Sequence, residues 1–245
     1  MTEVFPKAPI TEALIDVRTQ LPQDVSLDKL EALHDWVRVE YPEKQKRTMW
    51  EGLFELKNEK DPLTTSRHQL VGYLFRSADG TQAVQFRLDG FTFSRLRPYT
   101  RWEQVFSEAK RLWDIYRVHA KPVRVNRLAT RYINSIEIPF KKFDYDDYFT
   151  MAPKMPNGLP QVLTHFFTRV VVPFPEEGVT AIIAQTPSEK PDPIKSSVIL
   201  DIDVFKEVSL SPEDAKIDEI LAILRKVKNA IFFGSITPKT KELFR

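Results

Sequence analysis

Two short segments between residues 82 and 97 constrain the fold most, because each alternates apolar and polar residues and a tight turn separates them. Residues 82–88 and 91–97 flank Asp89-Gly90, a dipeptide favoured in two-residue β-hairpin turns. They are therefore expected to form an antiparallel pair of strands. The pairs expected across the turn are Leu88 with Phe91, Phe86 with Phe93, and Arg87 with Thr92.

This hairpin is expected to have one apolar face and one polar face. Side chains alternate along a strand, so five apolar residues share one side, which we expect a helix to cover: Val84, Phe86, Leu88, Phe91 and Phe93. The other side carries Gln85, Arg87, Thr92 and Ser94, and Arg76 of the preceding segment is expected beside them. The sheet is therefore predicted to bury one face and to leave the other polar.

Similar patterns predict the other elements. Alternation predicts strands at residues 10–21, 48–57, 69–76, 127–138, 165–172, 179–185 and 197–205. Apolar residues at helical spacing predict helices at residues 26–40, 102–119 and 212–229, with Ser26 as the N-cap of the first. Short helices are expected at residues 145–149 and after Thr237, where Pro238 takes the first helical position.

The order of these elements repeats once along the chain. Each half runs from a strand to a helix, then to several antiparallel strands, and ends in a long helix. We therefore expect an α+β fold of two pseudo-repeated halves, residues 1–123 and 124–245, as two units or as one continuous domain. Together they would form a large antiparallel sheet with the long helices packed on one face.

Composition removes several classes of site. The chain has no cysteine, which excludes disulfides, thiolate zinc sites and cysteine nucleophiles and fits a reducing compartment. Its seven glycines are scattered and form no phosphate-binding loop, so no cofactor is expected. The first residues lack a secretory signal pattern, and no apolar run approaches the roughly 18 residues of a membrane helix. We expect a cytoplasmic protein without membrane contact.

Two arginines lie on one side of the expected strand 127–138. Leu128 and Tyr132 belong to its apolar side, whereas Arg127 and Arg131 point the other way, about 13 Å apart. One interpretation is that each arginine pairs with a carboxylate of a neighbouring strand. The other is that they bind acidic groups or phosphates of a partner. The carboxylates available for pairing are Glu12, Asp16, Asp201 and Asp203.

The absence of a recognisable catalytic motif favours a binding or regulatory protein over an enzyme. We expect a polar sheet face to hold a protein partner or an anionic ligand. Its residues would be Arg76, Arg87, Arg127 and Arg131, with Glu12 as the accompanying carboxylate. Nucleic acid is an alternative partner for the same face, although a net charge of +2 gives no general preference for it.

A metal-dependent enzyme acting on phosphate esters is a second alternative. Asp201 and Asp203 are two residues apart on an expected strand, so both carboxylates project from one face. Glu12 or Asp16 could complete a cluster of the hard oxygen ligands that Mg²⁺ prefers. Aspartates at this spacing are common on strands, and no second motif accompanies them.

Three segments carry a resemblance: FPKAPITEALIDVR near the start, RYINSIEIP in the centre and KNAIFFGSITPKTKELF near the end. Together they resemble a sporadically distributed, uncharacterised bacterial protein family of about this length, over nearly the whole chain. The resemblance implies a bacterial, cytoplasmic, single-unit protein, and it brings no catalytic residues. Because patchy distribution often accompanies mobile or defence genes, it also implies an antitoxin- or defence-associated partner protein.

Overall fold

The computed structural model describes residues 5–55, 63–160, 163, 165–188, 192 and 194–245. The strands are β1 (Ile10–Gln20), β2 (Glu43–Glu55), β3 (Leu63–Arg76), β4 (Gln82–Arg87), β5 (Gly90–Leu96), β6 (Arg124–Ile138), β7 (Thr168–Phe174), β8 (Val179–Pro187) and β9 (Ser196–Leu210). They form one sheet in the order β2-β3-β4-β5-β1-β6-β9-β8-β7, and every pair is antiparallel. Residues 1–123 and 124–245 thus contribute to a single sheet, joined where β1 pairs with β6.

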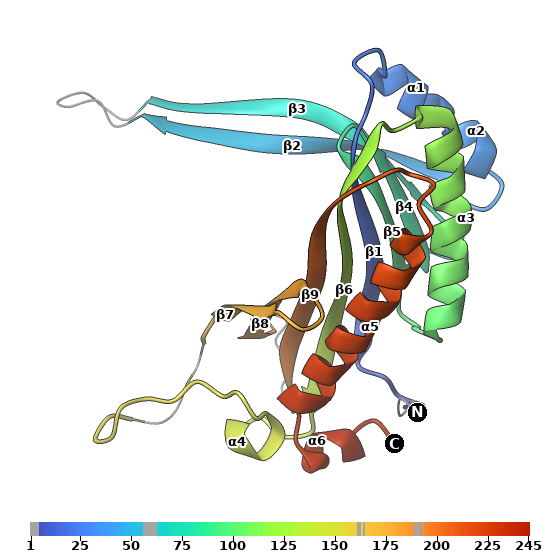
Figure 1. Cartoon of the computed structure of the whole chain (residues 1–245). Helices are drawn as coiled ribbons and strands as arrows, with labels where there is room; N and C mark the ends of the chain where they lie inside the picture. Colours follow the sequence, from blue (N-terminus) through green and yellow to red (C-terminus); the bar gives the residue numbers. More distant parts are fainter. Residues whose placement is uncertain (1–4, 56–62, 161–162, 164, 189–191, 193) are drawn as a thin grey trace.

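The helices are α1 (Leu27–Ala32), α2 (His34–Val37), α3 (Trp102–Ala120), α4 (Tyr145–Tyr148), α5 (Lys216–Ser235) and α6 (Pro238–Glu242). The long helices α3 and α5 lie over the same face of the sheet (Figure 1). The α+β class, the antiparallel sheet and the packing of long helices on it are therefore confirmed. Thr237 caps α6 by accepting a hydrogen bond from the Thr240 N–H, with Pro238 at the first helical position as predicted.

Two predicted helices have different bounds. The prediction of one helix at 26–40 is wrong, because the chain forms α1 and α2 with Leu33 between them. Ser26 is nevertheless the N-cap, since its hydroxyl accepts from the Lys29 N–H at 3.4 Å. The helix expected from residue 212 begins at Lys216, because the Asp214 carboxylate accepts from the Lys216 N–H and holds the preceding residues in a turn.

The predicted register of the central hairpin is also wrong, by two residues. The observed pairs are Arg87–Gly90, Phe86–Phe91, Gln85–Thr92 and Val84–Phe93. Gly90 therefore belongs to β5 rather than to the turn. Its φ of +146° favours glycine, and a Cβ there would lie 2.2 Å from the Val17 carbonyl oxygen of β1. Because the shift is an even number, the predicted apolar and polar faces are unchanged.

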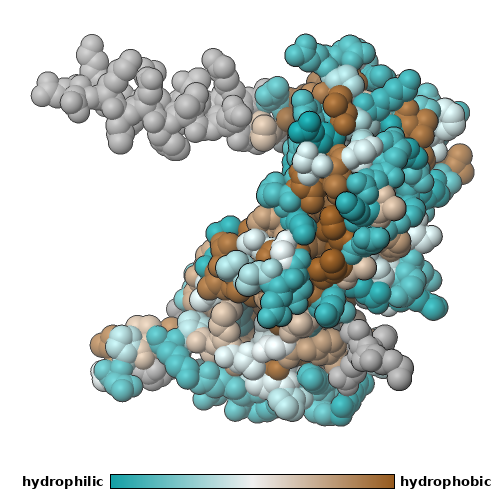
Figure 2. All heavy atoms as spheres, viewed as in Figure 1, coloured by the Kyte–Doolittle hydropathy of each residue, from teal (hydrophilic) through white to brown (hydrophobic). Residues whose placement is uncertain are grey.

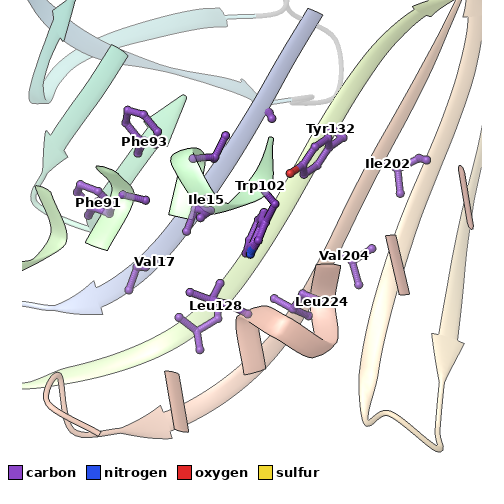
Figure 3. Packing of buried hydrophobic residues seen from close by; sticks show 14 of the residues in the cluster. Ile15, Val17, Phe91, Phe93, Trp102, Leu128, Tyr132, Ile202, Val204 and Leu224 are labelled. Atoms are coloured by element: carbon purple, nitrogen blue, oxygen red, sulfur yellow. The ribbon is translucent and has the colours of Figure 1, made fainter. Parts of the chain in front are cut away.

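The apolar face carries the core. Figure 3 shows residues from four adjacent strands on one side of the sheet, with Trp102 of α3 and Leu224 of α5 packed against them. The strand residues are Ile15 and Val17, Phe91 and Phe93, Leu128 and Tyr132, and Ile202 and Val204, all of them buried. Figure 2 shows hydrophobic side chains between α3 and α5 and hydrophilic ones over their outer surfaces. This is the arrangement expected of amphipathic helices on a sheet.

None of the long helices in the described part of the chain covers the opposite face of the sheet, which we call the open side. The described helices α1, α2, α3 and α5 all lie on the apolar side, and the β2–β3 pair extends past the body of the sheet (Figure 1). Strand register places Gln85, Arg87, Thr92 and Ser94 on the open side, together with Arg76. The prediction of a polar sheet face is thus confirmed for these five residues.

Candidate functional site

The open side carries charged residues on neighbouring strands. We call the following set the polar face: Gln85 and Arg87 of β4, Asp89 of the turn, Thr92 and Ser94 of β5, Glu12, Asp16 and Arg18 of β1, Arg127 and Arg131 of β6, and Asp201 and Asp203 of β9. β1 lies between β5 and β6, and β9 follows β6. Residues far apart in the sequence are therefore adjacent on one surface.

Asp16 lies at the centre of the polar face. Its Oδ1 accepts hydrogen bonds from Arg87 Nη2 at 3.0 Å and from the Thr92 hydroxyl at 2.6 Å. Its Oδ2 accepts from Arg18 Nε at 3.0 Å and from Arg127 Nη1 at 3.5 Å. Burial alone would raise the pKa of Asp16, but the charges of Arg87 and Arg18 and the Thr92 hydrogen bond lower it below its ordinary value. Asp16 is therefore held as a carboxylate.

Arg87 connects this centre to the hairpin turn. Its side chain is 9% exposed, and its Nε donates to Asp89 Oδ1 at 2.8 Å. Its Nη1 donates to the Thr92 hydroxyl at 2.7 Å and to Gln85 Oε1 at 3.5 Å, so with Asp16 and Asp89 the guanidinium contacts four side chains. Asp89 also pairs with Arg18. A buried arginine of this kind is stable only with such compensation.

Arg127 carries the network across β6 to β9. Its Nη2 donates to Asp203 Oδ2 at 3.0 Å, and its guanidinium lies 4.3 Å from the centre of the Phe205 ring. Burial raises the pKa of Asp203 above its ordinary value, and the charge of Arg127 only partly opposes this. The second oxygen of Asp203, Oδ1, is buried and has no hydrogen-bond partner among the described residues.

Arg131 forms the outermost pair. Its Nε donates to Asp201 Oδ1 at 2.8 Å and its Nη2 to Oδ2 at 2.5 Å, the two-pronged geometry typical of arginine and carboxylate. The Arg131 side chain is 44% exposed, which makes it the most accessible of the three predicted arginines in the network. Of the two interpretations of Arg127 and Arg131, carboxylate pairing is thus the arrangement that the structure contains.

Two of the predicted site residues lie outside this network. Glu12 is half-buried on the same side of β1, and Arg76 is half-buried at the end of β3. Within the described part of the chain, neither makes an ion pair. The structure therefore links Arg87 and Arg127 through the shared Asp16 carboxylate, places the separate Arg131–Asp201 pair on the same face, and leaves Glu12 and Arg76 outside these ion pairs.

The carboxylates proposed for a metal are already engaged. Asp201 is bound by Arg131, and Asp203 by Arg127. Across the described ranges, no three histidine or acidic side chains gather in a way that could hold a metal ion. The arrangement of Asp201 and Asp203 thus favours ion pairing with arginine over metal binding.

Arg18, Asp89 and Phe205 are members of the site that sequence reasoning missed. Arg18 could have been found, because it lies two residues from Asp16 on the same side of an alternating strand. Asp89 was assigned to the turn alone. The contact of Phe205 with Arg127 depends on the pairing of β6 with β9, which no local pattern predicts.

Comparison with protein families and with curated proteins gives no relative from which a role for these residues can be taken. The chain matches no protein-family model, and no curated protein matches it. In the part of the chain that is described, no helix is both long enough and apolar enough to cross a membrane. The function is therefore inferred from the geometry of the chain.

Proposed function

We propose that the chain is a non-enzymatic binding protein that holds a protein partner on its polar face. The observation that carries this proposal is the ladder of paired charges on the open side of the sheet. Asp16 and its arginine partners lie over β4, β5 and β1, and the pairs of Arg127 and Arg131 continue the ladder to β9. The buried Asp16–Arg87 pair anchors this ladder, and its more exposed members, Arg18, Asp89 and Arg131, present both charge signs at the surface.

The balance of charge favours protein over nucleic acid as the partner. Four arginines of the ladder (Arg18, Arg87, Arg127 and Arg131) meet four aspartates (Asp16, Asp89, Asp201 and Asp203). Nucleic-acid binding depends on unneutralised cations that displace counterions from phosphates. Mixed charges, in contrast, match the complementary patterns of protein interfaces and give specificity more than affinity.

An apolar surface adjoins the ladder. Ile182 of β8 pairs with Asp203, and Val171 of β7 pairs with Ile182, so both project from the open side. Ile182 is half-buried, whereas Val171 is 53% exposed. Apolar residues bordered by charged ones are the usual composition of a protein interface. The partner is therefore expected to cover β9, β8 and β7 as well as the ladder.

We further infer that the two halves are structural pseudo-repeats. In the first half the opening strand β1 pairs with the last strand β5, and in the second half β6 pairs with β9. The remaining strands of each half follow outward in reverse chain order, and β1 and β6 lie antiparallel at the centre. A partner on the polar face would therefore contact equivalent strands of both halves.

The experiment is affinity purification of the full chain from its host, followed by titration of each copurifying protein against matched variants. The decisive variant exchanges the outermost pair, Arg131→Asp with Asp201→Arg. It keeps an ion pair on an exposed site, so stability should change by less than about 1 kcal/mol. The charge pattern presented to the partner is inverted, so affinity should fall at least about tenfold. Arg124→Ala, an exposed arginine at the start of β6, is the control and should bind normally.

Two results would overturn the proposal. One is a partner that binds the exchanged variant as tightly as the unmodified chain. The other is copurification of nucleic acid whose binding weakens steeply with added salt, since phosphate contacts release counterions.

A further inference from the structure

A second candidate site lies on the helix-covered side of the sheet. A cavity of about 340 Å³ opens where the residues preceding β1, the first turn of α3 and the C-terminal half of α5 meet. This volume lies at the lower end of the range of small-molecule sites, which is about 300–1,000 Å³. Its apolar lining includes Phe5, Ile10, Trp102, Phe232 and Phe233.

Lys228 of α5 lines this cavity and is the unusual residue in it. Lys228 is only 7% exposed, and its Nζ lies 3.6 Å from the centre of the Tyr132 ring. Within the described residues, Lys228 forms no hydrogen bond and no ion pair. Buried lysines ordinarily have a carboxylate partner. This one has only the face of an aromatic ring, which attracts a cation weakly.

The neighbouring charges do not supply that partner. Arg225 lies three residues earlier on the same face of α5 and also lines the cavity. It pairs with Glu103 of α3 at 3.3 Å and lies 5.3 Å from the centre of the Trp102 ring. Glu103 is 64% exposed, so this carboxylate sits toward solvent. Three cationic residues, Lys228, Arg225 and Arg101, therefore line the cavity together with an apolar wall, and Glu103 is the single carboxylate at its rim.

We propose that this cavity binds a small organic carboxylate, whose anionic group pairs with Lys228 and Arg225 while its apolar or aromatic body packs against Phe232 and Trp102. A carboxylate fits because it brings one negative charge to a buried ammonium that lacks one, and because the remaining wall is apolar. The site is separate from the polar face and independent of the function proposed for it.

Proton linkage gives the proposal a signature. Burial, with a smaller contribution from the charge of Arg225, lowers the pKa of Lys228 to about 7. The other titratable or charged groups around the cavity are Tyr99 and Arg101 before α3, Glu103 in its first turn, Tyr132 of β6, and Arg225. Binding of an anion requires the ammonium form. Affinity should therefore be highest near pH 6 and fall about tenfold between about pH 6 and pH 8 as Lys228 loses its proton. It should fall again below about pH 5, where the carboxylate ligand is itself protonated.

The experiment is calorimetric titration of the full chain with phenylacetate, octanoate and the neutral analogue phenylacetamide at about pH 6. At least one carboxylate should bind, and phenylacetamide should bind at least about tenfold more weakly. Lys228→Met keeps the volume of the side chain and should lower carboxylate affinity at least about tenfold. Lys226→Met, which replaces an exposed lysine of the same helix, should leave it unchanged.

Three results would overturn the proposal. The first is no binding of either carboxylate up to about 10 mM, which corresponds to less than about 3 kcal/mol of binding free energy. The second is equal binding of phenylacetate and phenylacetamide. The third is an affinity for carboxylate that does not change between about pH 6 and pH 8 in the unmodified chain, a readout that needs no variant to fold.

Discussion

The Asp16 carboxylate of β1 and the Arg87 guanidinium of β4 meet at 3.0 Å across the intervening strand β5. Gly90 of β5 pairs with Arg87 of β4 on one side and with Arg18 of β1 on the other, so β5 places no side chain between the two outer strands at this position. Thr92, also of β5, bonds to both partners. Asp16 and Arg87 therefore fasten three strands together on the open side of the sheet, where no described helix does so.

Removal of Asp16 should destabilise the fold strongly. Asp16→Leu leaves Arg87 buried and without its main partner, which ordinarily costs about 3–5 kcal/mol. The free energy of unfolding, measured by urea denaturation followed by circular dichroism, should fall by that amount.

A double variant separates the lost charge partner from the change in shape. Asp16→Leu with Arg87→Met replaces the pair by apolar side chains, which are often tolerated as well as a buried pair. It should be more stable than Asp16→Leu alone. If the double variant is instead the less stable of the two, the unpaired Arg87 is not the origin of the loss.

Protonation of Asp16 should lower the free energy of unfolding of the chain at acid pH. The pKa of Asp16 in the folded chain is below its ordinary value of 3.8, so the unfolded state binds more protons as the pH drops through that range. The stabilisation is present above pH 3.8 and is lost as the pH falls through the lower folded value. The stability gap between the unmodified chain and Asp16→Asn should therefore narrow as the pH is lowered.

Asp203→Asn is the matched comparison and should show the opposite trend. The folded-state pKa of Asp203 is raised above its ordinary value of 3.8, so the folded chain holds this proton to a higher pH than the unfolded chain does. The free energy of unfolding of the unmodified chain therefore falls as the pH rises from 3.8 through the folded-state pKa. The stability of Asp203→Asn relative to the unmodified chain should thus increase with pH. Parallel trends for the two variants in urea titrations would contradict one of the two assignments, and the sign of the common trend would show which.

Replacement of Lys228 should stabilise the chain at neutral and acid pH. Burial lowers the pKa of Lys228 from its ordinary value of 10.5 to about 7, so between these values the unfolded state binds more protons than the folded state. The free energy by which the buried lysine destabilises the fold therefore decreases as the pH rises through this range. Lys228→Met should therefore raise the free energy of unfolding by a few kcal/mol, on the order of the pKa shift, near pH 6 and by less near pH 9. Lys226→Met should show neither effect, and a gain that does not depend on pH would argue against a buried ammonium.

Gly90 should not tolerate a side chain. The Cβ of Gly90→Ala would meet the Val17 carbonyl oxygen at 2.2 Å, and backbone in the centre of a sheet cannot move away cheaply. We expect a loss of about 3 kcal/mol or more, measured as a shift in the urea midpoint. Gly80→Ala, at φ +68° with nothing within 4 Å of the new Cβ, should cost only about 1–2 kcal/mol. Equal losses of stability in the two variants would mean that the positive backbone φ, and not the contact of the new Cβ with β1, causes the loss at Gly90.

Local patterns predicted the fold class and the two faces of the sheet, because alternation and helical spacing are set by side chains near in sequence. The hairpin register failed because Asp89-Gly90 resembles a turn, whereas the reason for Gly90 is the approach of β1. That approach is a contact between distant segments. The same limit applies to the pairing of Arg127 with Asp16 and Asp203, which follows from β6 lying between β1 and β9.

Lys228 shows the reverse case, in which a usable signal was present. It lies four residues after Leu224 and seven after Leu221, so helical spacing places it on the buried side of α5. A lysine on such a stripe indicates either a buried cation or a side chain that reaches the surface. Only the packing of β1, α3 and α5 around it distinguishes the two.

The central position of the β1–β6 pair has a consequence for the order of folding during synthesis. When residues up to the end of α3 have left the ribosome, β1 can pair with β5 on one side, but its other partner does not yet exist. The nascent chain then presents β1 as an unpaired edge until β6 emerges, and such edges recruit other chains. Translation pauses or chaperones that act in this interval should therefore affect the yield of folded protein more than those acting after β6 has been made.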